Sequence, residues 1–136
     1  MGIRSYIEDN YDFDIVDEFL DHYNLMCESM ETIVINISDE EMRERSIDEL
    51  FRIIHNIKSA SAYLKIISMN RLASVVEEEL EDIRDLHKPV SQEAIDWLIK
   101  ISDMFATWND DFKQDNELSK VTYSLIKLPD MEELNL

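Results

Sequence analysis

The chain has 136 residues, of which 32% are charged and 45% are apolar, and it carries a formal net charge of −18 at pH 7. This size predicts one domain with a single core, and the apolar content is too high for a generally disordered chain. The acidic charge argues against binding to nucleic acid or to anionic membrane surfaces, because both require clustered Lys and Arg.

Glycine, proline and cysteine are scarce, which narrows the choice of fold and site. One Gly and two Pro argue against turn-rich all-β folds and glycine-rich nucleotide loops. Cys27 is the only cysteine, so an intrachain disulfide and a cysteine-rich zinc site are excluded, and we expect a small core residue there. No apolar run reaches the ~20 residues of a membrane span and no signal peptide opens the chain. We therefore predict a cytoplasmic protein without membrane insertion.

Apolar residues recur at steps of three and four along the chain, which predicts helices throughout. A short helix over residues 3–7 is expected to precede the first long helix. Asp12 or Asp14 could cap the start of that long helix. A polar loop follows, and Ser46 with Glu49 forms a capping box that predicts the start of the second long helix.

Ser68 or Asn70 is the predicted cap of the third long helix, which ends at the first proline of the chain. Ser91 is the predicted cap of the fourth. The sequence thus predicts an all-α fold, an antiparallel up-down four-helix bundle, over residues 1–114. Residues 115–136 again carry apolar residues at helical spacing, so we expect either one additional C-terminal helix or a linker tail.

Two of the three histidines lack an organised neighbourhood, and we expect His22 and His87 to have structural or surface roles. A di-iron bundle would need Glu-x-x-His on two helices, but the residues three before the histidines are Phe19, Arg52 and Arg84. The glycine-bearing nucleophile turn of a Ser-His-Asp hydrolase is missing as well. We therefore predict no metal site and no cofactor.

His55 lies in a stretch without acids: no Asp or Glu occurs from Leu50 to Val76, although 31 of the 136 residues are acidic. Arg52 and Lys58 lie three residues before and after the histidine, close to one helix face. Such a face could be no more than a basic, solvated surface. The alternative is a site that must tolerate a dianion.

Ser59 and Ala62 lie further along the same helix face as His55. Their small side chains leave room for another macromolecule to approach the histidine closely. A neutral imidazole is a good nucleophile, and a phosphoryl group on its nitrogen would be stabilised by nearby cations. Under the second interpretation, His55 would carry a phosphoryl group.

The segment HNIKSASAYL resembles the signature of histidine-containing phosphotransfer domains, which is roughly His-x-x-Lys-(Gly/Ser)-x-(Ala/Ser). It maps onto His55, Lys58, Ser59 and Ser61. The resemblance covers about residues 14–113. It looks closest to the N-terminal phosphoacceptor (P1) domain of chemotaxis-type histidine kinases, which is an up-down bundle with an additional helix.

The resemblance implies that His55 is the phosphoacceptor and that Lys58 neutralises the phosphoryl group. Glu77 is the first acid after the gap, and it stands where those kinases carry a glutamate that holds the ring nitrogen that is not phosphorylated. Two residues depart from the family's pattern. Ser59 replaces a usual glycine, and Lys65 replaces a common one, which could alter the helix end or add a charge to a docking surface.

The resemblance also implies two partners, a histidine kinase catalytic domain that supplies the phosphoryl group and a response-regulator receiver domain whose aspartate takes it. Because the chain has no ATP-binding glycine loop, it would be a phosphocarrier and not an enzyme. Two alternatives stay open: the chain is the P1 domain of a larger chemotaxis kinase, or it is a helical adaptor that is never phosphorylated. The expected partner-binding residues are Arg52, Ser59, Ala62 and Lys65, with Tyr63 and Ile66 as candidate rim residues.

Overall fold

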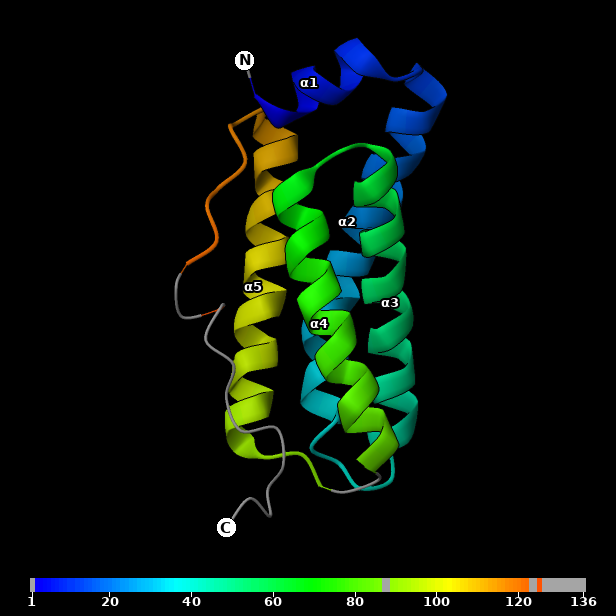
Figure 1. The fold of residues 1–136 in the computed structure, drawn as a ribbon, viewed down its shortest axis with the longest axis vertical. Coiled ribbons are helices and arrows are strands. Elements are labelled where there is room, and N and C mark those ends of the chain that lie inside the picture. The colour runs from blue at the N-terminus through cyan, green and yellow to red at the C-terminus, as the bar shows by residue number, and fades with distance from the viewer. Residues whose placement is uncertain (1, 87–88, 123–124, 126–136) are drawn as a thin grey trace.

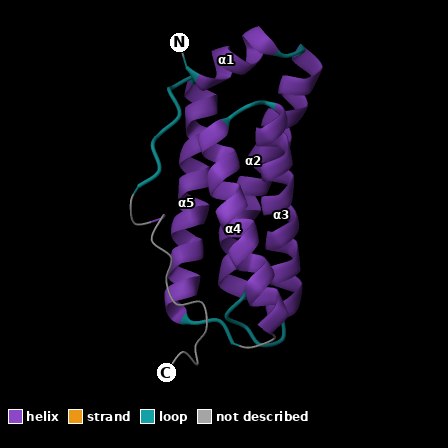
Figure 2. Ribbon diagram, in the orientation of Figure 1, coloured by secondary structure: helices purple, strands orange, loops and turns teal. Residues whose placement is uncertain are grey.

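The computed structural model describes residues 2–86, 89–122 and 125, and helices make up its regular structure (Figure 2). Helices α2 to α5 alternate in direction and pack as a four-helix bundle, and α1 lies across one end of it (Figure 1). The predicted all-α class and antiparallel bundle are confirmed. The helices are α1 (Ile3–Asn10), α2 (Phe13–Asn36), α3 (Arg43–Tyr63), α4 (Ile67–Leu86) and α5 (Gln92–Gln114).

The core is formed by one apolar stripe from each long helix, and aromatic side chains fill the space between α2 and α5. Tyr23 is fully buried, and its hydroxyl donates to the Phe105 carbonyl at 2.7 Å. The rings of Phe19 and Tyr23 both meet Phe112 edge-on, with centroids 5.4 and 5.6 Å apart. Burying each such side chain contributes about 1.5–3 kcal/mol. No helix among the described residues has an apolar stretch that could cross a bilayer.

Two predicted helix starts are confirmed and two are wrong. Asp12 is the N-cap of α2, and Ser91 is that of α5, where its hydroxyl accepts a hydrogen bond from a backbone N–H. The capping box at Ser46 is wrong, because α3 already begins three residues earlier and Ser46 is buried within it. Ser68 and Asn70 are not caps either, because α4 begins before them, at residue 67.

Lys65, which follows the C-cap of α3, is in the left-handed conformation with φ of 58°. The Ile66 N–H donates to the Ser61 carbonyl at 2.9 Å, and the Lys65 N–H donates to the Ala62 carbonyl at 3.2 Å. These are the two hydrogen bonds of a Schellman motif, in which glycine is the favoured residue. The departure at Lys65 therefore falls on a helix end that requires positive φ.

Asp115 at the end of α5 holds the N-terminus of α1. Its carboxylate accepts hydrogen bonds from both the backbone N–H and the hydroxyl of Ser5, and these bonds lower the pKa of Asp115. The Ile3 N–H donates to the Asn116 carbonyl at 2.8 Å. Gly2 must be glycine, because a Cβ there would lie 1.9 Å from the Asp115 carbonyl oxygen.

The described part of the tail packs along α5 without forming a helix over residues 116–122. The indole N–H of Trp108 donates to the Ser119 carbonyl at 2.7 Å, and that of Trp97 donates to the Leu125 carbonyl at 3.2 Å. Both carbonyls accept hydrogen bonds from α5, and residues 116–122 do not form the additional helix that was one of the two expectations. The rest of the expected helix, apart from Leu125, lies outside the described residues.

Ending the chain after Asn116 should remove these tail contacts and leave the contacts of Asp115 in place. We expect a red shift of tryptophan fluorescence, because Trp97 and Trp108 become exposed, and a loss of roughly 1–3 kcal/mol in unfolding free energy. A chain that ends after Thr122 keeps the Ser119 contact and should lose less. An unchanged spectrum and stability in the shorter chain would contradict the packed tail.

Lys65→Gly should raise the free energy of unfolding by about 0.5–1 kcal/mol, because glycine adopts positive φ without steric cost. Urea denaturation measures the change. Lys65→Ala is the matched control, since it removes the charge and keeps the Cβ, and we expect no gain from it. Equal gains in both variants would show that the charge, and not the backbone, sets the effect.

Candidate functional site

His55 lies on the solvent side of α3, next to the fully buried Ile54, and its side chain is 56% exposed. Helix α4 packs antiparallel against α3 and brings Glu77 opposite the histidine. The Glu77 side chain is only 14% exposed. A carboxylate that is mostly buried needs partners for both oxygens, and α3 provides them.

Both carboxylate oxygens of Glu77 accept hydrogen bonds from side chains of α3. The His55 Nδ1 lies 2.6 Å from Oε2, and the Lys58 Nζ donates to Oε1 at 2.9 Å. A carboxylate can only accept, so Nδ1 carries the proton and Nε2 of the neutral ring has the free lone pair. The three residues that the resemblance connects are thus brought together in one cluster.

Opposing effects act on the pKa of Glu77. Desolvation by burial is the largest of them and acts to raise this pKa, but the hydrogen bonds and charges of Lys58 and His55 outweigh it together. The net result is a pKa below the usual range for glutamate. Glu77 is therefore ionised at neutral pH and supports positive charge on the ring.

The backbone beneath the site is tied to α4 as well. The side-chain amide of Asn70 donates to the Lys58 carbonyl at 2.9 Å, and the Ser61 hydroxyl donates to the Ile57 carbonyl at 2.7 Å. Asn70 is thus an inter-helix contact and not the predicted helix cap. It fixes the spacing of α3 and α4 near the Glu77 cluster.

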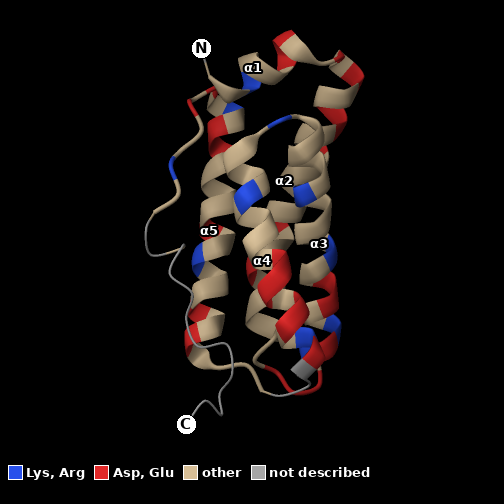
Figure 3. Ribbon diagram, in the orientation of Figure 1, with Lys and Arg blue, Asp and Glu red and all other residues tan. Residues whose placement is uncertain are grey.

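The acid-free stretch becomes a surface because the chain folds back on itself between α3 and α4. In Figure 3, Lys and Arg are the charged residues in the upper halves of these helices, and Asp and Glu gather toward their lower ends. Arg52, Ser59 and Ala62, which were predicted to bind a partner, are exposed on α3. Lys65 is exposed too, but it lies at the helix end, roughly 15 Å along the axis from His55.

The two candidate rim residues have different outcomes. Tyr63 is exposed, but Ile66 is only 3% exposed, so its rim assignment is wrong. Ile67 is 64% exposed instead. The sequence missed Ile67 because the predicted caps placed the start of α4 after it.

Phe51 is a neighbour of the site that sequence reasoning missed. Its ring lies one turn before His55, with centroids 6.4 Å apart and planes 10° apart. The Arg84 guanidinium lies over the Phe51 ring, 4.3 Å from its centroid. The spacing of Phe51 to His55 could have indicated the first contact, but the second needs the register of α3 against α4.

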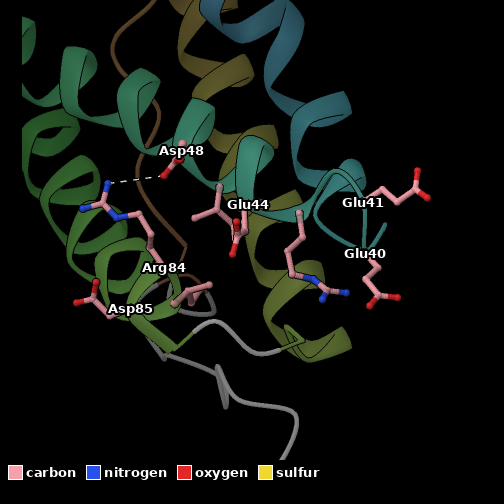
Figure 4. Close-up of a pocket in the computed structure, with 9 residues that line it drawn as sticks. Glu40, Glu41, Glu44, Asp48, Arg84 and Asp85 are labelled. Carbon is pink, nitrogen blue, oxygen red and sulfur yellow. Dashed lines mark ion pairs between the residues drawn. The ribbon is translucent and has the colours of Figure 1, made fainter.

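A hollow with mostly acidic walls lies at the far end of α3 and α4 (Figure 4). Its carboxylates make it unsuitable for a phosphoryl group. Among the described residues, no group of three or more His, Cys, Asp or Glu is placed to hold a metal ion. The lining residues are Glu40, Glu41, Arg43, Glu44, Ile47, Asp48, Ile83, Arg84 and Asp85.

The other candidate side chains remain outside the cluster. Cys27 is half-buried, and its thiol lies 3.5 Å from the Phe105 carbonyl. Burial raises the pKa of Cys27 to about 12, so it is not a thiolate nucleophile. His22 is exposed on α2, and His87 lies outside the described residues.

Comparison with known proteins identifies the family of the chain. The Hpt domain family matches residues 14–114, so the chain belongs to this family and is a phosphotransfer domain of the two-component class. The chemotaxis protein CheA of Borreliella burgdorferi is 23% identical over 91 residues, which are 67% of this chain and 10% of that protein. The chain thus spans about a tenth of this relative's length. No solved structure is significantly similar to the chain.

Glu77→Ala should change both the tautomer of His55 and the pH dependence of stability. Without an acceptor at Nδ1, we expect the ring ¹⁵N shifts, measured at about pH 9 where histidine is neutral, to report a tautomer mixture. A lowered folded pKa stabilises the fold above the unfolded pKa of the carboxyl, and this contribution is lost as pH falls through the folded pKa. The stability difference between wild type and variant should therefore shrink in acid.

Glu77→Gln separates the two effects, because glutamine keeps an acceptor oxygen and loses the charge. We expect it to retain the Nδ1–H tautomer and to lose the same pH-dependent stability as Glu77→Ala. If the wild-type ring showed a tautomer mixture, the Nδ1 assignment would be wrong.

Proposed function

We propose that this Hpt domain carries a phosphoryl group on Nε2 of His55. A histidine kinase catalytic domain would supply the group, and the receiver-domain aspartate of a response regulator would take it. One observation supports this most: Nδ1 is engaged by Glu77 at 2.6 Å while the His55 side chain remains 56% exposed. The engaged nitrogen faces α4, which leaves the other nitrogen for a partner.

In the first step, the Nε2 lone pair attacks the γ-phosphorus of ATP held by the kinase. An N–P bond forms, the bond from phosphorus to the bridging oxygen breaks, and ADP leaves. The ring gains a positive charge while Nδ1 keeps its proton, and the Glu77 carboxylate stabilises that charge. Lys58, one turn along α3, supplies a cation near the transferred oxygens.

In the second step, a receiver carboxylate attacks the phosphorus and the N–P bond breaks. The electron pair returns to Nε2, so the ring becomes neutral again with its proton still on Nδ1. No proton has to move in either direction. The domain needs only a fixed nucleophile and an approach surface, and its small residues Ser59 and Ala62 lie exposed beside His55.

The match to a chemotaxis protein favours one particular context for the domain. Because the similarity covers 10% of that relative, the chain corresponds to one segment of it. We propose as a second candidate that the domain acts as the P1 segment of a chemotaxis kinase, phosphorylated by a catalytic domain of the same protein. Whether the domain acts separately or as a P1 segment, we propose that it lies in the cytoplasm and that His55 has the same role.

His55→Gln should abolish phosphorylation completely. The chain is incubated with ATP and an active histidine kinase, and protein-bound phosphate that is labile in acid and stable in base is quantified. His22→Gln is the matched control, because His22 is exposed on α2 and outside the cluster, and it should label like wild type. Labelling that persists in His55→Gln would refute the site. If wild type is not labelled by any active kinase, the non-phosphorylated adaptor is favoured.

A further inference from the structure

We infer that Phe51, itself held by Arg84, is a positioning residue that fixes the plane of the His55 ring. Its effect on phosphoryl transfer rests on the proposed function, but the effect on the ring itself does not. The inference starts from what the Glu77 contact leaves undetermined.

One hydrogen bond at Nδ1 fixes one atom of the imidazole. The ring moves through rotation about χ1 and χ2, and small changes in these two angles that keep the hydrogen bond still shift Nε2. With 56% of the side chain exposed, solvent offers no restraint. Attack on phosphorus needs the Nε2 lone pair to be aligned with the incoming group. A second contact to the ring would limit this movement.

Phe51 provides that second contact. It lies one turn before His55 on α3, and the two rings are within 10° of parallel at a centroid distance of 6.4 Å, inside the range of interacting aromatic pairs. Phe51 is half-buried and packs against the core, so its own freedom is limited. At this separation the near-parallel rings are offset, so Phe51 borders the imidazole and limits its movement on that side.

Arg84 extends this arrangement to α4. Its guanidinium carbon lies 4.3 Å from the Phe51 centroid, a cation–π distance. The same guanidinium is 3.9 Å from the Asp48 carboxylate (Figure 4). Phe51 is therefore restrained by its packing against the core and by Arg84 of α4. Arg84 is in turn close to the Asp48 carboxylate of α3. Helix α4 therefore acts on the histidine twice, at Nδ1 through Glu77 and at the ring plane through Arg84.

The test compares Phe51→Leu, which keeps apolar volume and removes the ring, with Phe51→Tyr, which keeps the ring. The first readout is the ¹³C order parameter of the His55 ring by NMR, and it needs no partner. We expect the order parameter to fall in Phe51→Leu and to be retained in Phe51→Tyr. The ring ¹⁵N shifts should stay unchanged in both, because Glu77 still holds Nδ1.

Arg84→Gln provides a second variant on a side chain that is 39% exposed, so it should fold even where Phe51→Leu does not. Its His55 ring should lose order in the same direction, by less. The second readout is phosphorylation by the kinase. We expect kcat to fall about 3- to 10-fold in Phe51→Leu with KM unchanged, since orientation of the nucleophile acts on the reacting step.

An unchanged His55 order parameter in folded Phe51→Leu, or in Arg84→Gln if the first variant does not fold, would overturn the positioning role. A ring that loses order equally in Phe51→Tyr would also overturn it. The proposed function fails separately: wild type would then take up no phosphate, while the NMR comparison would still report on the ring.

Discussion

The candidate site depends on one carboxylate that two α3 side chains share. Both oxygens of Glu77 are used, one by His55 and one by Lys58, so the position of α4 along α3 must be correct to within a fraction of a turn. A slip of one turn would move Glu77 by about 5.4 Å and break both contacts. The histidine is therefore only as well placed as the packing of these two helices.

Several features away from the histidine maintain that packing. The Asn70 amide reaches across to the Lys58 carbonyl, and the buried residues Val76 and Leu80 flank Glu77 on α4. The connection between the helices has only residues 64–66, with Lys65 in a strained conformation. A short connection limits how far α4 can shift along α3. Its geometry requires positive φ at Lys65, which costs conformational energy at a non-glycine residue. Both the fold and the site thus depend on the same helix pair.

Periodicity was sufficient to predict the bundle, because four long amphipathic helices have few other ways to bury their stripes. Helix starts were less predictable. Ser46 has the sequence of a cap but lies inside α3, since backbone hydrogen bonds from the preceding turn already satisfy its N–H. Tail residues 116–122 have apolar residues at helical spacing, yet the Ser119 carbonyl accepts a hydrogen bond from the Trp108 indole of α5 instead of a helical one. Local patterns cannot show such competition from distant side chains.

The cluster of His55, Lys58 and Glu77 was predictable from spacing and family resemblance together. The residues that orient it were not. In the sequence, Phe51 is one more apolar residue of α3, and Arg84 is one more charged residue near a helix end. Their relation to the histidine follows from the register of two helices and from which rotamers the packing permits. Sequence spacing indicates which residues are neighbours along one helix, but it says little about which residues of another helix lie opposite them.

The charge distribution completes the physical argument for this face. A phosphoryl group would add negative charge to a chain whose formal net charge is already −18. Acidic residues spread evenly over the surface would repel that group. Exposed charges are largely screened beyond about 8 Å at physiological salt, so only the nearby surface matters. Antiparallel pairing of α3 and α4 turns a one-dimensional gap in acids into such a surface around His55 (Figure 3). Glu77, the acid that contacts His55, is already neutralised by Lys58 at 2.9 Å. Acids elsewhere can then give the chain its net negative charge without opposing the chemistry that we propose at the histidine.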